Sequence, residues 1–153
     1  MPSEYELSDD IRLTRHIQLL HSRGVKEVRV LCVDFDGAIT GENKYPNIGE
    51  FRRGAIAALK AFEQAGGKVL VWTCREGVWR DRALSLLKID GFVPDWVNGE
   101  TILRGSRKPF FDLLIDDRAL GCVLDWYFIG KLLKEMAPKD KQWFKRLKGG
   151  FIN

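Results

Sequence analysis

The sequence is poor in cysteine and has no long hydrophobic run, and each scarcity excludes a class of protein. Its three cysteines are odd in number and form no C-x-x-C pair, so neither a disulfide framework nor a zinc site is indicated. No apolar stretch approaches the roughly 18 residues of a membrane-spanning helix. The segment "MPSEYELSDD" is acidic and polar, unlike a secretion signal or a transit peptide. We therefore expect a cytoplasmic protein without a membrane partner.

Two nucleotide-binding motifs are also missing. The chain contains neither G-x-x-x-x-G-K-[ST] nor G-x-G-x-x-G, so nucleoside triphosphatases and dinucleotide-dependent enzymes have no support. The formal net charge of +4 is mildly basic. Such a charge tolerates anionic partners but does not by itself indicate nucleic acid.

The 153 residues, 45% of them hydrophobic and 30% charged, have the profile of one globular domain with a sizeable core. We divide this domain into a helical extension at 1–27, a core at 28–130 and a basic helical tail at 131–153. The tail carries seven lysines and arginines with Trp143 and Phe144 among them. It could grip nucleic acid, but a solvated amphipathic helix that packs its aromatic side chains is the favoured interpretation.

Short apolar runs alternate with segments of helical periodicity. Strands are predicted at 28–33, 68–72, 112–115 and, from a weaker pattern, 95–98. Helices are predicted at 8–23, from 51 to the glycines at 66–67, from 79 to Gly91, at 125–136 and at 140–148. This alternation predicts an α/β fold, a three-layer α/β/α Rossmann-like parallel sheet. The strands need not alternate polar with apolar residues, because parallel strands are covered on both faces.

Polar residues follow each of the three confident strands. They are Asp34 and Asp36 after the first strand, Thr73 after the second, and Asp116 and Asp117 after the third. Lys108 precedes the third strand and could reach the same edge. In open α/β sheets ligands bind beyond the carboxyl ends of the strands, so we expect these groups to converge.

The chemistry of this set suits a phosphoryl group. Several carboxylates repel one another unless a cation lies among them, and hard oxygen ligands favour Mg²⁺. A hydroxyl and an ammonium group suit phosphate oxygens. One carboxylate could then attack phosphorus, and a second carboxyl could protonate the leaving oxygen. A polar turn remains the alternative for the aspartates, a strand-end hydroxyl bonded to backbone for Thr73, and a solvated side chain for Lys108.

These residues resemble the haloacid dehalogenase (HAD) superfamily of phosphohydrolases. The family pattern is matched, in order, by "DFDGAIT", "VWTCRE", "SRKPF" and "LLIDDRA". The segments "YPNIGE", "WTCREG" and "SRKPFFDLLIDDRALG" further resemble a small group of capless HAD-like hydrolases from bacteria. The likeness spans about residues 28–130, and the four motifs together are far more specific than D-x-D alone.

The resemblance implies a role for each of these residues. Asp34 would be the nucleophile and Asp36 the general acid and base. Asp34 and Asp116 would hold Mg²⁺, aided by the backbone carbonyl of Asp36, while Asp117 would be a supporting metal partner or a structural partner of Arg118. Thr73 and Lys108 would hold the phosphoryl group.

One residue departs from the family pattern. Ala38 stands where the family usually has Thr, which removes a hydroxyl hydrogen bond of roughly 0.5–1.5 kcal/mol, so we expect a less ordered loop with its chemistry intact. The intervals 37–50 and 74–107 are too short for a cap domain. An uncapped site favours a large substrate or a second subunit of a homo-oligomer that covers it.

Three functions compete at this point. The first is a Mg²⁺-dependent phosphatase that acts through an aspartyl-phosphate on a nucleotide, a nucleic-acid end or a sugar phosphate. The second is a HAD-like module that binds metal or phosphate with little turnover. The third, a phospho-accepting receiver domain, is disfavoured by the order of the motifs. A receiver places its acidic pair on the first strand and its acceptor Asp later, before Thr and Lys, whereas here the acidic pair Asp116-Asp117 comes last. Arg75 and Glu76 could contact substrate or form a surface ion pair with each other.

Overall fold

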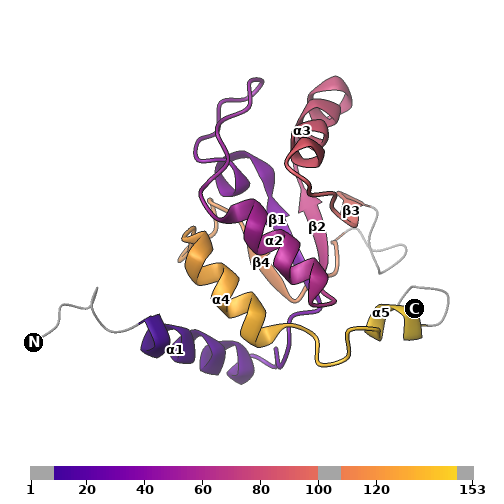
Figure 1. Ribbon diagram of the computed structural model, residues 1–153. Coiled ribbons are helices and arrows are strands. Elements are labelled where there is room, and N and C mark those ends of the chain that lie inside the picture. The colour runs from indigo at the N-terminus through magenta and orange to yellow at the C-terminus, as the bar shows by residue number, and fades with distance from the viewer. Residues whose placement is uncertain (1–8, 100–107, 148–153) are drawn as a thin grey trace, which may run out of the picture.

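The computed structural model describes residues 9–99 and 108–147 and contains a four-stranded parallel sheet flanked by helices (Figure 1). The strands are β1 (Val30–Asp34), β2 (Lys68–Trp72), β3 (Trp96–Val97) and β4 (Leu113–Ile115), in the spatial order β3-β2-β1-β4. All pairings between neighbouring strands are parallel. The predicted α/β fold is therefore confirmed, including the strand expected from the weaker pattern.

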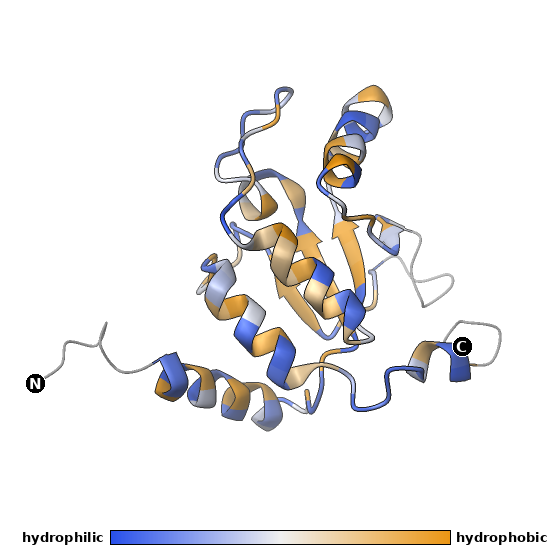
Figure 2. Ribbon diagram, in the orientation of Figure 1, coloured by the Kyte–Doolittle hydropathy of each residue, from blue (hydrophilic) through white to orange (hydrophobic). Residues whose placement is uncertain are grey.

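The central strand β1 is covered on both faces. Its residues Val30 to Val33 are fully buried. Leu31 and Val33 face the main core, whereas Val30 packs with Trp143 in a smaller cluster. Burial on both faces explains why this strand is uniformly apolar, and Figure 2 shows the sheet as the most hydrophobic part of the ribbon.

Two helices cover one face of the sheet side by side. They are α2 (Ala55–Gln64) and α4 (Trp126–Met136), which lie against each other in front of β1 (Figure 1). Asp125 caps α4, because its carboxylate accepts hydrogen bonds from the backbone N–H groups of Tyr127 and Phe128. The helix α1 (Asp9–Ser22) packs on α4 and adds Leu13, Ile17 and Leu20 to the edge of the core.

The remaining helices are α3 (Gly77–Ile89), which follows β2, and the short α5 (Trp143–Arg146). The helix predicted at 140–148 is therefore much shorter than expected, within the part that the structure describes. The boundary placed between residues 130 and 131 falls inside α4, which is continuous there. The favoured interpretation of the aromatic residues agrees with the structure, since Trp143 is buried and its indole N–H donates to the carbonyl of Gly66 at 2.8 Å.

No separate cap domain is present among residues 9–99 and 108–147. The segment between η1 (Phe35–Ile39) and α2 carries one isolated bridge, Thr40 to Phe51, and no other strand or helix. In the same described ranges no helix is both long and apolar enough to cross a membrane. Within the described residues, no cap domain therefore covers the carboxyl ends of the strands.

A pair of acidic side chains lies at the opposite edge of the sheet. Burial, followed by the charge of Asp95 and a hydrogen bond with it, raises the pKa of Glu63 to about 8. Lys68 offsets this only in part, with its ammonium nitrogen 3.6 Å from Asp95. One oxygen of Glu63 is buried without a hydrogen-bond partner, so ionisation of this carboxyl works against folding.

Replacing Glu63 by Gln should flatten the pH dependence of stability. The folded state keeps a proton on Glu63 up to about pH 8, whereas the unfolded state releases it near pH 4.5, so the wild-type protein loses stability as pH rises between these values. Because this carboxyl is only half buried, we expect the variant to gain about 1–2 kcal/mol over wild type between about pH 5 and pH 9. Urea unfolding at both pH values measures this. If the free energy of unfolding changes equally with pH in wild type and variant, the prediction is contradicted. The matched control is Glu135→Gln, an exposed change on α4.

Candidate active site at the carboxyl edge of the sheet

The direction in which the chain adds strands to the sheet changes beside β1. After β1 the chain builds β2 and β3 on one side and then returns to the other side for β4. The strand order therefore reverses between β1 and β4, and this is the topological switch point, where open α/β sheets bind ligands. Asp34 is the last residue of β1, and Asp116 and Asp117 directly follow β4.

Three of the predicted carboxylates meet at this switch point. Asp34, Asp116 and Asp117 each offer an oxygen, and these oxygens lie within 4.8 Å of one another. The strand register explains the approach, because Val33 of β1 is paired with Ile115 of β4 and the next residue on each strand is an aspartate. The convergence expected from the sequence is thus present for these three residues.

The electrostatics of the cluster reflect the crowding of like charges. Burial raises the pKa of Asp34 to about 8, and a hydrogen bond with Asp117 and the charges of Asp116 and Asp117 act in the same direction. The backbone N–H of Phe35 opposes the shift in part. Three oxygen donors that repel one another are a donor set suited to Mg²⁺, because a hard divalent cation removes the repulsion.

The loop after β1 is shaped around Asp117. Gly37 has φ of +88°, and a Cβ added at this position would collide with the Asp117 carboxylate. Only glycine combines this backbone conformation with the absence of a side chain, so the D-x-D-G pattern is a steric requirement of the acidic cluster here. Asp116, rather than Asp117, accepts the backbone N–H of Arg118, at 2.9 Å.

The same loop is well supplied with hydrogen bonds despite Ala38. The Thr40 hydroxyl accepts the N–H of Gly37 at 2.9 Å, and the indole of Trp126 donates to the carbonyl of Ala38 at 2.9 Å. The Arg52 guanidinium donates to the carbonyls of Gly37, Thr40 and Gly41. These bonds, together with the burial of residues 37–40, offset the missing hydroxyl, and the expected weakening of the loop is not seen in its bonding.

The fourth carboxylate, Asp36, is bonded to Arg75. The Arg75 Nε and Nη2 donate to the two oxygens of Asp36, both at 2.7 Å. Arg75 is only 1% exposed, so it is neither a surface partner of Glu76 nor a side chain open to solvent. The two residues are 39 positions apart and no sequence pattern joins them, which is why the pairing could not be foreseen.

Thr73 lies just beyond β2, and its side chain is half-buried. Its backbone N–H donates to the Asn98 side chain at 2.8 Å, and its hydroxyl oxygen accepts the N–H of Arg75 at 3.1 Å. The hydroxyl therefore makes the strand-end backbone bond that was the alternative to a phosphate contact. Because this bond uses a lone pair of the oxygen, the hydroxyl proton stays available for a phosphate oxygen.

One comparison with known proteins gives a match. No family model and no curated protein matches the chain. A solved structure of a conserved protein from Bacteroides thetaiotaomicron matches with a TM-score of 0.65 and 36% identity, over 71% of this chain and 91% of that one. The chain belongs to the family of this conserved protein.

Lys108 lies shortly before β4 in the chain. Its side chain is exposed, and its ammonium nitrogen lies 5.8 Å from the centre of the Phe111 ring. Phe111 packs in the smaller cluster with Val30 and Trp143.

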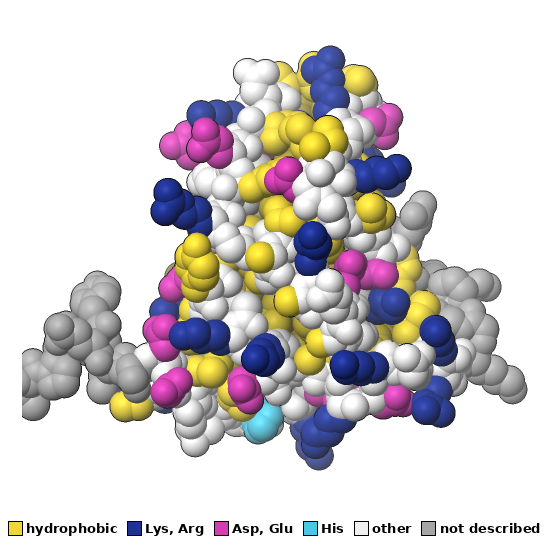
Figure 3. Space-filling view, in the orientation of Figure 1, with side chains coloured by type: hydrophobic (Ala, Val, Ile, Leu, Met, Phe, Trp, Pro, Cys, Tyr) yellow, Lys and Arg dark blue, Asp and Glu magenta, His cyan; other side chains and the backbone are white. Residues whose placement is uncertain are grey.

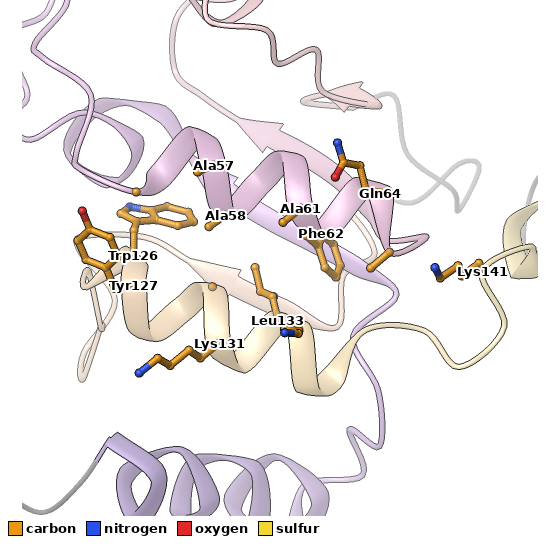
Figure 4. Close-up of a pocket in the computed structure, with 14 residues that line it drawn as sticks. Ala57, Ala58, Ala61, Phe62, Gln64, Trp126, Tyr127, Lys131, Leu133 and Lys141 are labelled. Carbon is orange, nitrogen blue, oxygen red and sulfur yellow. The ribbon is translucent and has the colours of Figure 1, made fainter.

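The family member also has a groove that contains none of these acids. This groove, between α2 and α4, has a volume of about 680 Å³ and lies on the face in Figure 3 where yellow side chains gather between dark blue ones. Ala57, Ala58 and Ala61 of α2 face Trp126 and Leu133 of α4 across it (Figure 4). No carboxylate lines it, so the groove offers neither the nucleophile nor the metal ligands that the acidic cluster supplies.

Mg²⁺ should stabilise the protein through the acidic cluster. At a Mg²⁺ concentration about 100 times Kd the gain is about 2.7 kcal/mol, which corresponds to a rise in Tm of several degrees. The rise should be larger at about pH 8 than at about pH 5, because Asp34, whose pKa is raised to about 8, must lose its proton to bind the ion.

Thermal unfolding with and without Mg²⁺ measures this effect in wild type and in Asp116→Asn. The Asp116→Asn variant should lose most of the rise. Asp81→Asn, an exposed change on α3, should keep it. If Mg²⁺ leaves the Tm of the wild-type protein unchanged at both pH values, the result would contradict a metal site here.

Proposed function

We propose that the protein is a Mg²⁺-dependent phosphomonoester hydrolase of the HAD type that acts through an aspartyl-phosphate on Asp34. The observation that carries the proposal is the meeting of the Asp34, Asp116 and Asp117 oxygens within 4.8 Å at the switch point of a parallel sheet. The resemblance of the four motifs to HAD phosphohydrolases supports it, and so does the strand order, which sets β1 beside β4 and so brings the aspartates that end these strands together.

Each residue has a definite task in this reaction. Asp34 attacks phosphorus, the bond to the leaving oxygen breaks, and the proton of Asp36 goes to that oxygen. Water then attacks phosphorus, the bond to Asp34 breaks, and Asp36 takes the proton of the water. The products are the alcohol and inorganic phosphate, and Asp34 is regenerated.

The remaining groups would bind the metal ion and the phosphoryl group and balance the charge of the phosphoryl oxygens. Asp34, Asp116 and the backbone carbonyl of Asp36 would hold Mg²⁺, with Asp117 in support. The bound ion would neutralise charge on the phosphoryl oxygens. Thr73 and Lys108 would hold those oxygens by a hydroxyl donor and a point charge. Acid–base help supplies only about 10²–10⁴ of an acceleration that reaches about 10²¹ for phosphate monoesters, so this positioning carries most of the catalysis.

The substrate class follows from the open edge. Because no cap encloses the site among the described residues, a nucleotide, a nucleic-acid end or a sugar phosphate can approach, and a second copy of the chain could cover the edge in a homo-oligomer. A panel of phosphorylated metabolites and 5′- or 3′-phosphorylated oligonucleotides, assayed for released phosphate, separates these classes. A second candidate function is a metal- and phosphate-binding module with little turnover, favoured by the capture of both Asp36 oxygens by Arg75.

Asp34→Asn should abolish turnover of a generic aryl phosphate in the presence of Mg²⁺. The amide cannot form the covalent intermediate, so we expect kcat to fall by about 10³-fold or more. Wild-type activity should also stop on addition of a chelator. Steady-state release of the aryl alcohol measures both effects, with Asp81→Asn as the control. An unchanged rate in the Asp34→Asn variant would refute the nucleophile, and an inactive wild type on the whole substrate panel would favour the binding module.

Lys108→Ala should weaken phosphate binding more than it affects folding. The loss of a charge-assisted hydrogen bond of about 1.5–3 kcal/mol lowers kcat/KM by about 10- to 100-fold and raises the inhibition constant of inorganic phosphate by a similar factor. The control is Lys88→Ala, an exposed lysine in the last turn of α3. If Lys108→Ala behaves like this control, Lys108 is a solvated surface residue.

A further inference from the structure

Arg75 makes more contacts than a surface ion pair requires. Besides its two bonds to Asp36, its guanidinium donates to the carbonyl oxygens of Pro46 at 3.1 Å and Asn47 at 2.7 Å. The rings of Phe35 and Tyr45 lie 5.5 and 5.1 Å from its guanidinium carbon. Burial of a charged group is costly unless all its donors are satisfied, and here the surroundings supply acceptors on several sides.

The position of Arg75 connects it with two residues of the proposed reaction. Its side chain holds Asp36, which lies two residues after Asp34. Its backbone N–H holds the hydroxyl oxygen of Thr73 at 3.1 Å. A single residue thus touches the proposed proton donor and the proposed phosphate ligand, while it is itself nearly inaccessible to a substrate.

The geometry of the pair fixes orientation. A guanidinium that binds a carboxylate through two parallel N–H···O bonds sets both the direction and the rotation of the carboxyl plane. Each carboxylate oxygen has two lone pairs and Arg75 uses one on each, so the outer lone pairs of Asp36 stay free to exchange a proton. The Asp36 side chain is 11% exposed, so solvent reaches a small part of it.

We propose that Arg75 is a positioning residue that acts through Asp36: it aims the Asp36 carboxyl at the reacting oxygen and ties residues 45–47 to the site. This inference rests on the proposed function, because it assigns Arg75 a part in the same reaction. Lysine cannot replace it, since an ammonium group lacks the planar pair of parallel N–H donors that matches a carboxylate.

A double-mutant cycle on kcat tests this role. Arg75→Gln, Asp36→Asn and the double variant are compared with wild type on an aryl phosphate in saturating Mg²⁺. Since acid–base help contributes about 10²–10⁴, we expect Asp36→Asn to lose about 10²-fold or more and Arg75→Gln at least about 10-fold. In the Asp36→Asn background the Arg75 change should cost less than about threefold, because Arg75 then has no carboxylate to aim.

Two further measurements separate positioning from mere structure. The Mg²⁺-induced rise in Tm should be retained in Arg75→Gln, since Asp34, Asp116 and Asp117 are unchanged. Arg75→Lys, which keeps the charge and serves as the second variant if Gln disturbs folding, should lose kcat to a similar extent with little change in KM. Arg82→Gln is the matched control, because Arg82 is an exposed arginine of α3 that lies over the Trp79 ring.

The outcomes are distinct. Equal losses from the Arg75 change in the wild-type and Asp36→Asn backgrounds would overturn the inference while leaving the phosphatase intact. Full activity of Arg75→Lys would overturn it too, because charge alone would then suffice. An inactive wild type would remove the proposed function and this inference with it. If Arg75→Gln lowers kcat only when Asp36 is present, Arg75 is established as a positioning residue.

Discussion

The site depends on the hydrogen-bond register between β1 and β4. Val33 is paired with Ile115, so the chain residues that come next, Asp34 and Asp116, leave adjacent parallel strands at the same level. Neighbouring strands lie only about 4.8 Å apart, so side chains that leave them at the same level can meet. A slip of one residue in this register would turn the side chains of β4 to the other face and separate the acids. Packing of the apolar strand residues is therefore what holds the charged residues together.

The acids of this edge fall into two electrostatic groups. Asp36 has a buried cationic partner, and its charge is balanced by Arg75 within the folded chain. Asp34 is half-buried with carboxylates for neighbours, so burial, reinforced by those neighbours, raises its pKa to about 8. The fold thus carries an unbalanced cluster next to a balanced pair. A protein pays for such a cluster with stability, and functional sites are where this cost is commonly found.

Much of this arrangement could be predicted from the sequence. The β-branched runs identified the strands, and the parallel topology implied that Asp34, Asp116 and Asp117 would meet. The buried role of Arg75 could not be predicted, because its partner Asp36 and the carbonyls of residues 46 and 47 are far away along the chain and the loop path is not encoded in a periodic pattern. The structure of the tail also differs from the prediction, for a similar reason. The aromatic residues Trp143 and Phe144 pack on the sheet, and this packing shortens the helix expected there.

The anchoring of α5 has a consequence for how the molecule can be handled. Trp143 is fastened to Gly66 and packs on Val30, both at the edge of the sheet opposite the acidic cluster. Lys145 and Arg146 of α5 therefore lie at the opposite edge of the sheet from the three carboxylates. Attachment to a support or a fluorophore through α5 would leave the carboxyl edge facing the solution.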